Sequence, residues 1–96
     1  MKKLILLLFF IPIVSFGQTA EEYKYSGNDK ANANDYNGAI SDYTKAIELN
    51  PNDGGAYFKR GVSKYFNNDL NAACEDAKKS RSLGFDASTL IQAACN

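Results

Sequence analysis

Apolar positions recur at helical spacing through most of the chain after residue 18, and turn-forming residues interrupt them at regular distances. Pro51 and the following Asn52, Asp53, Gly54 and Gly55 mark the clearest interruption, because proline and glycine both stop helices. The pattern predicts helices over residues 20–33, 37–49, 54–67 and 71–83, and a shorter one over 86–95. The chain is therefore expected to be all-α.

Residues at the predicted helix starts can accept hydrogen bonds from free backbone amides. Thr19 and Glu22 have the spacing of a capping box, and Asp53 and Asp86 are further candidates for N-caps. An apolar face is expected along the second helix, formed by Ala39, Ile40, Tyr43, Ala46, Ile47 and Leu49.

The sequence repeats itself without a gap, so that residues 20–53 align with residues 54–87. Ten positions of the first unit recur in the second, a level of identity that chance does not explain. They are Tyr23, Gly27, Lys30, Asn34, Asp35, Asn37, Ala39, Asp42, Lys45 and Leu49. Each unit contains two predicted helices, so we expect repeat 1 over residues 20–53 and repeat 2 over 54–87.

The first unit resembles the tetratricopeptide repeat. Large, small and proline residues stand where that family has them, namely Tyr23, Gly27, Tyr36, Ala39, Tyr43, Ala46 and Pro51. The second unit departs from the pattern at Leu70, Ser80 and Phe85. The resemblance implies a fragment of an α-solenoid, made of two helix-turn-helix repeats and a C-terminal capping helix over 86–95.

The last predicted helix continues the repeat register, since Ile91 and Cys95 lie one full repeat beyond Tyr57 and Gly61. A solenoid must cover the apolar face of its last hairpin to stay soluble, so Leu90, Ile91 and Ala94 are expected to pack against that face. The alternative is a frayed tail, which is common at chain termini.

The segment over residues 1–17 has the order of an export signal. Basic Lys2 and Lys3 precede an apolar run over residues 4–14, and Ser15 and Gly17 are the small residues that a signal peptidase reads. We expect cleavage after Gly17, which leaves a repeat domain over 18–96 in the periplasm or outside the cell. The alternative is a membrane anchor, but the run is shorter than the roughly 20 residues of a membrane span.

Charge and composition limit the function classes. Without Lys2 and Lys3, nine basic residues remain against 11 acidic ones, so the exported domain would carry about −2. This balance does not favour nucleic acid or anionic lipid as partners.

The two cysteines, Cys74 and Cys95, are expected to form a disulfide, because an even count in an exported protein favours pairing. In the repeat register, Cys95 takes the place of a close-contact glycine and should face the preceding helix. The alternative is a pair of unbonded small core residues.

Catalytic groups are scarce in this sequence. The chain has no histidine and no glycine-rich phosphate loop, and Asp35 and Asp69 recur at predicted turns, where carboxylates cap helices. We expect no enzyme activity, no cofactor and no metal site. Other charged residues are expected on solvated faces: Glu21, Glu22, Lys45, Glu48, Lys78, Lys79 and Arg81.

The concave side of a solenoid is lined by the first helix of each repeat, and here it is the candidate partner site. The residues expected there are Lys24, Asn28, Phe58, Lys59, Val62 and Phe66. The resemblance implies that Lys24 and Asn28 match two residues with which carboxylate-binding family members hold a peptide C-terminus. Lys59 replaces an asparagine of that group, and Thr89 and Ala93 stand where it has basic residues, so the match is partial. The alternative for the apolar members is packing beneath the capping helix.

We therefore expect a protein–protein interaction module of the cell envelope, an adaptor or assembly scaffold that is monomeric alone and binds a protein or peptide segment. The alternative is a constitutive structural subunit of an envelope complex, without a free peptide groove. An enzyme would need a composite site completed by another chain.

Overall fold

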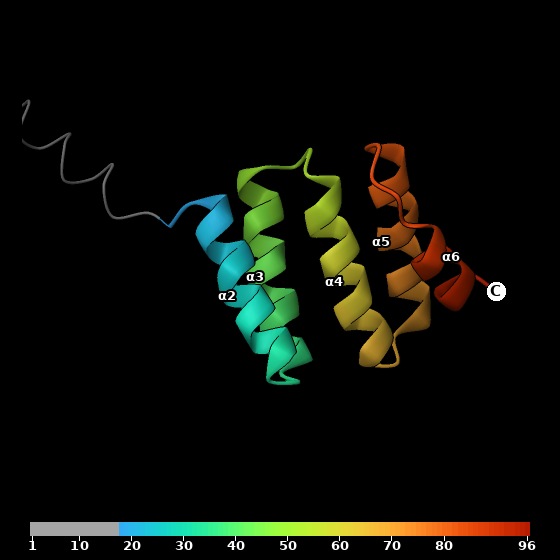
Figure 1. Ribbon diagram of the computed structural model, residues 1–96, viewed down its shortest axis with the longest axis horizontal. Helices are drawn as coiled ribbons and strands as arrows, with labels where there is room; N and C mark the ends of the chain where they lie inside the picture. Colours follow the sequence, from blue (N-terminus) through green and yellow to red (C-terminus); the bar gives the residue numbers. More distant parts are fainter. Residues whose placement is uncertain (1–17) are drawn as a thin grey trace, which may run out of the picture.

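The computed structural model describes residues 18–96, which form five helices (Figure 1). The predicted export signal over residues 1–17 lies outside the described residues. The helices are α2 (Ala20–Asn32), α3 (Tyr36–Leu49), α4 (Gly54–Phe66), α5 (Leu70–Ser82) and α6 (Ser88–Ala94). Helices α2 and α3 form one antiparallel hairpin, α4 and α5 form the next, and α6 packs on the second hairpin (Figure 1). The predicted all-α architecture with a capping helix is confirmed, and a frayed tail is wrong.

The N-caps follow the repeat register. Those of α2, α4 and α6 are Thr19, Asp53 and Ala87, each one full repeat after the one before. Thr19 forms the predicted capping box with Glu22, and Asp53 accepts a hydrogen bond from the backbone of α4. Asp86 is not an N-cap: its carboxylate accepts hydrogen bonds from the backbone and hydroxyl of Ser88 in a short turn before α6.

The two aspartates at the hairpin turns also cap helices. Asp35 accepts a hydrogen bond from the backbone amide of Gly38, and Asp69 accepts one from that of Ala72. Each carboxylate thus satisfies an amide that the helix itself leaves free. The capping role expected for both residues is confirmed.

Asparagine recurs at the turns because the backbone there is left-handed. Asn34 and Asn68 have φ angles of 63° and 64°, in a region that asparagine tolerates better than most residues. The following residue in each turn, Asp35 or Asp69, donates its backbone amide to the carbonyl five residues earlier and closes the helix end. After α5, Gly84 takes the same place with a φ of 91°.

Small residues let the helices of each hairpin approach closely. Ala39, Ala46, Ala73 and Ala77 are almost fully buried. A Cβ atom on Gly27 would lie 2.7 Å from the ring of Tyr43, so only glycine fits there without rearrangement. Leu49 was expected on the apolar face of α3 but is 57% exposed, because it lies in the final turn of that helix beyond the packed core.

Each hairpin also buries one carboxylate between cationic or hydroxyl groups. In the first, Asp42 accepts a hydrogen bond from Ser26 and pairs with Lys30 at 3.0 Å. In the second, the equivalent Asp76 accepts two hydrogen bonds from Arg60, at 2.9 and 2.8 Å, and pairs with Lys64 at 3.0 Å.

Arg60 also connects the repeats, since its Nη1 donates to Thr44 on α3. Hydrogen bonding to Asp76 raises the pKa of Arg60 and outweighs the opposing effect of burial. The guanidinium therefore stays charged in its partly buried position.

Two departures of the second unit from the family pattern have local explanations. Ser80 is fully buried, and its hydroxyl donates to the carbonyl oxygen of Gly54 at 2.7 Å. Phe85 lies against Gly54, and a Cβ atom added to Gly54 would be 2.9 Å from the Cβ atom of Phe85. The ring of Phe85 also contacts the ring of Phe58, with centroids 5.1 Å apart. Ser80 therefore ties the end of α5 to the start of α4, and Phe85 ties the segment before α6 to the same helix.

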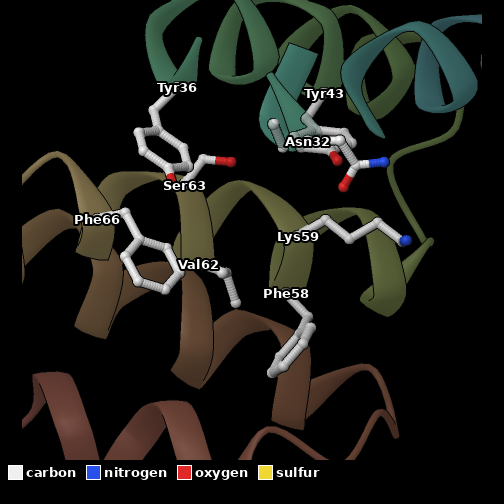
Figure 2. Close-up of a pocket in the computed structure, with 9 residues that line it drawn as sticks. Asn32, Tyr36, Tyr43, Phe58, Lys59, Val62, Ser63 and Phe66 are labelled. Atoms are coloured by element: carbon white, nitrogen blue, oxygen red, sulfur yellow. The ribbon is translucent and has the colours of Figure 1, made fainter. Parts of the chain in front are cut away.

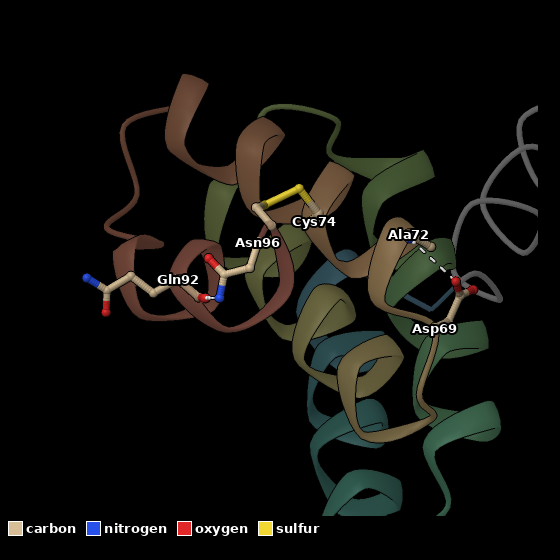
Figure 3. The surroundings of a disulfide bond; sticks show 6 residues. Asp69, Ala72, Cys74, Gln92 and Asn96 are labelled. Carbon is tan, nitrogen blue, oxygen red and sulfur yellow. Dashed lines mark hydrogen bonds between the residues drawn. A yellow bond between two sulfur atoms is a disulfide. The ribbon is translucent and has the colours of Figure 1, made fainter.

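Helix α6 buries Leu90 and Ala94 and half-buries Ile91, as predicted. Leu90 packs against Gly61, where a Cβ atom would lie 2.8 Å from its methyl carbon. The predicted disulfide between Cys74 and Cys95 is present and joins α5 to the end of α6, with the two Cα atoms 4.9 Å apart (Figure 3).

Candidate functional site

A pocket of about 260 Å³ opens between the first hairpin and α4. One wall carries residues of α2 and α3 and the other carries residues of α4, and their side chains face one another across it (Figure 2). The lining residues are Ala31, Asn32, Tyr36, Tyr43, Phe58, Lys59, Val62, Ser63 and Phe66. The lining is mainly apolar, with amide, ammonium and hydroxyl groups at a few positions.

Four of the six residues proposed from the sequence meet in this pocket. Phe58, Val62 and Phe66 are four residues apart along α4, so they form one stripe, and Lys59 lies beside them. Phe66 is 59% exposed and stacks on Tyr36, with ring centroids 5.4 Å apart. Val62 lies between the two phenylalanines, so the stripe offers an apolar surface about 12 Å long at the helical rise.

Lys24 does not line the pocket. Its ammonium is 2.7 Å from Asp53 and 3.2 Å from Glu21, and the hydrogen bond to Asp53 raises its pKa despite the opposing effect of burial. In return, hydrogen bonds from Lys24 and from the α4 backbone outweigh burial and hold the pKa of Asp53 below its ordinary value. Lys24 thus ties α2 to the start of α4.

Asn28 also lies outside the pocket lining, but it binds two residues that belong to the lining. Its side-chain oxygen accepts hydrogen bonds from the hydroxyl of Tyr43 at 2.6 Å and from the ammonium of Lys59 at 3.2 Å. The two residues that match the carboxylate-binding group, Lys24 and Asn28, are therefore both engaged within the chain. Their arrangement does not favour that mode of recognition.

Lys59 is the charged residue of the lining. Within residues 18–96, no carboxylate lies within ion-pair distance of its ammonium, whereas Lys24 has two such partners and Lys30 and Lys64 have one each. Asn28 orients the Lys59 side chain without neutralising it. The pocket therefore combines an apolar stripe with one uncompensated positive charge.

Phe58 and Val62 have a second set of neighbours. Both pack against the cluster that α6 forms with α5, whose buried members are Ala73, Ala77, Ala87, Leu90 and Ala94. The sequence left open whether these residues line a groove or lie beneath the capping helix, and they do both. One side of each faces the pocket, and the other is supported by the cluster.

Tyr36 and Tyr43 contribute to the pocket but were assigned from the sequence to helix packing only. Tyr36 supplies the ring on which Phe66 stacks, and Tyr43 is buried with its hydroxyl bonded to Asn28. Burial, and then the charge of Asp42, raise the pKa of Tyr43, so the hydroxyl stays protonated at neutral pH. The helical spacing of these two tyrosines on α3 indicated a buried face of the helix. It did not indicate that the edge of this face would line a pocket.

Residues 27–67 match the family described as TPR repeat, the tetratricopeptide repeat. The chain therefore contains a tetratricopeptide-repeat region over these residues. It is 38% identical over 64 residues to the small glutamine-rich tetratricopeptide repeat-containing protein 2 of Mycosarcoma maydis. That alignment covers 67% of this chain and 18% of the relative, so the similarity spans a small part of that longer protein.

Tetratricopeptide repeats form a non-catalytic family of protein–protein interaction modules, and seven of the nine residues that line the pocket belong to α2 and α4, the first helices of the two hairpins. Across residues 18–96, none of the tetratricopeptide-repeat helices combines the length and apolar character that crossing a bilayer requires. Thr89 and Ala93, which correspond to basic residues of the carboxylate-binding group, are exposed on α6.

Proposed function

We propose that this protein is an adaptor that binds a segment of a partner protein in the pocket between the first hairpin and α4. The observation that carries the proposal is the exposed ring of Phe66, which stacks on the partly buried Tyr36, on the same pocket lining as the ammonium of Lys59, which has no carboxylate partner among residues 18–96. A bound segment would place an apolar side chain against the exposed ring of Phe66 and an acidic group near Lys59.

The aromatic contact is expected to contribute more to affinity than the charge. Phe66 presents a large apolar surface that a partner can remove from water, while a half-buried ammonium remains partly hydrated. Phe66→Ala should weaken binding by at least about 1 kcal/mol, or about fivefold. Lys59→Met should mainly lower the association rate and its dependence on salt.

Site-specific crosslinking in the native cell tests the location before a partner is known. A photoreactive benzoyl-phenylalanine in place of Phe66 should give an adduct whose partner segment can be sequenced. Leu70 is the matched control, because it is an exposed apolar residue of the same repeat that does not line the pocket. Equal adducts from both positions, or none from position 66, would contradict the proposed site.

A structural subunit without a free groove remains the second candidate, and purification separates it from an adaptor. The adaptor should be a stable monomer in which Phe66→Ala leaves the helical circular dichroism unchanged. The subunit should aggregate without its complex, because an interface of its own would then be exposed.

We further propose that the protein acts in the cell envelope or outside the cell after residues 1–17 are removed. The support is the basic, apolar and small-residue order of that segment. N-terminal analysis of the exported protein should begin at Gln18. Intact Met1 in a membrane fraction would show instead that the segment is retained as an anchor.

A further inference from the structure

We infer that the Cys74–Cys95 disulfide is a redox latch that holds α6 in place and thereby keeps the wall of the partner pocket assembled. This inference concerns the regulation of the site and rests on the proposed function. Its first element is the weakness of α6 without the bond. The helix has seven residues, and isolated helices of that length are not stable in water.

The noncovalent contacts of α6 are also few. The side chains that the helix and its N-cap bury almost completely are Ala87, Leu90 and Ala94, and two of these three are alanines. The N-cap makes no side-chain hydrogen bond to the helix, unlike those of the other four helices. The disulfide lies at the opposite end of α6 from the loop that connects it to α5, so the bond and the loop together fix both ends of the helix (Figure 3).

The second element is the connection between α6 and the pocket. Phe58 and Val62 line the pocket and also pack on the cluster to which Leu90 and Ala94 of α6 belong. Phe85, in the loop that leads into α6, contacts the ring of Phe58 in a tilted arrangement. If α6 and its loop detach, Phe58 and Val62 lose the neighbours that α6 and Phe85 provide, while Ala73 and Ala77 of α5 remain.

The first hairpin has no such dependence. Its two helices pack on each other, α3 packs on α4, and the pocket residues Tyr36 and Tyr43 belong to this part. Opening the latch should therefore disorder the α4 wall of the pocket while leaving the opposite wall in place. The result is a site that is assembled in the oxidised protein and incomplete in the reduced one.

A dithiol reductant, small or protein-borne, opens the latch. One of its thiolates attacks a sulfur of the disulfide, forms a mixed disulfide and releases the other cysteine, which takes up a proton. The second thiol of the reductant then displaces the remaining cysteine, so the reductant leaves as a disulfide and both cysteines become thiols. Cys74 and Cys95 are only half-buried, which leaves the bond open to attack.

Nuclear magnetic resonance of the oxidised and dithiothreitol-reduced protein tests the inference without any partner. On reduction, the α6 amides should exchange with solvent faster by about 100-fold, the factor expected when a covalent loop of this size is opened. The Val62 methyl and Phe58 ring signals should shift, those of Ala39, which is buried within the first hairpin, should not, and reoxidation should restore the first spectrum.

Two variants serve as controls. The double variant C74S/C95S should match the reduced protein and should not respond to dithiothreitol. Leu90→Ala with the disulfide intact should leave α6 attached. This variant therefore distinguishes the effect of the disulfide from the effect of the packing of Leu90.

Three results would overturn the inference: α6 amides that remain protected after reduction, Val62 and Phe58 signals that do not follow α6, or unfolding of the whole chain. If the spectra change as expected but crosslinking at position 66 finds no partner, the proposed function fails and the latch stands.

Discussion

Replacing Asp76 with alanine should destabilise the fold by about 3 kcal/mol. The Asp76 side chain is 6% exposed and compensates two cations, Arg60 and Lys64. Removing one partner of a buried ion pair costs about 3–5 kcal/mol because the other charge is left uncompensated. Here the cations keep 17% and 19% of their side chains exposed, so water recovers part of that cost and the lower end applies.

The first repeat supplies a matched control. Asp42 occupies the same register position, but its cationic partner Lys30 is 42% exposed and its other partner is the neutral hydroxyl of Ser26. Asp42→Ala leaves an ammonium that can rehydrate, so the expected loss is about 1 kcal/mol. The same substitution at equivalent positions should therefore differ in cost about threefold.

Urea unfolding of the oxidised proteins, followed by circular dichroism at 222 nm, measures both losses. Asp76→Asn belongs in the series because it retains the shape of the side chain and removes its charge. Its unfolding free energy should lie between that of the wild type and that of Asp76→Ala. The reasoning is refuted if Asp76→Ala and Asp42→Ala cost the same at equal urea dependence, since burial of the paired cations would then contribute nothing.

Three further predictions concern stability. Ser80→Ala should cost about 1–2 kcal/mol in urea unfolding, because the buried carbonyl of Gly54 loses its donor. Asn68→Gly should change the unfolding free energy by no more than about 0.5 kcal/mol, and Asn68→Val should lower it by about 1–2 kcal/mol at a φ of 64°. Burial raises the pKa of Asp42 and Asp53, but hydrogen bonds and the charge of a neighbouring lysine outweigh it and hold both below the ordinary 3.8. The stabilisation by these two carboxylates is complete above pH 3.8 and is lost as the pH falls through their pKa values in the folded protein. The unfolding free energy should therefore decline below about pH 4 and stay flat between about pH 5 and 8.

The helices could be predicted because their signals are local. Apolar spacing, proline and glycine positions, and capping residues all act within one or two turns, and the bounds agree with the structure to within two residues at each end. The capping helix and its disulfide could be predicted because the repeat register places Cys95 where Gly61 had already indicated a close contact. Leu49 and Asp86 failed for the same reason: each stands at a helix end, where periodicity no longer determines the environment.

The pocket could be predicted only in part because its composition depends on pairings between helices. The recurrence of Asp42 as Asp76 marked a structural role, but the sequence did not show which cations each would meet. Lys24 was expected on the binding surface, and its pairing with Asp53, 29 residues further along, removes it from there. Such pairings are decided by the stacking of one repeat on the next, which leaves no local signal in the sequence.

The position of the disulfide also has a mechanical consequence. The bond joins residues 21 positions apart and encloses only the later part of α5, α6 and the loop between them. A force applied through the two ends of the domain would pass from Cys74 directly to Cys95, so the enclosed segment would bear no tension. The extensible length of the domain would be shorter by roughly 70 Å at about 3.3–3.6 Å per residue. The first repeat, which has no covalent crosslink, would extend under load while the enclosed segment remains folded.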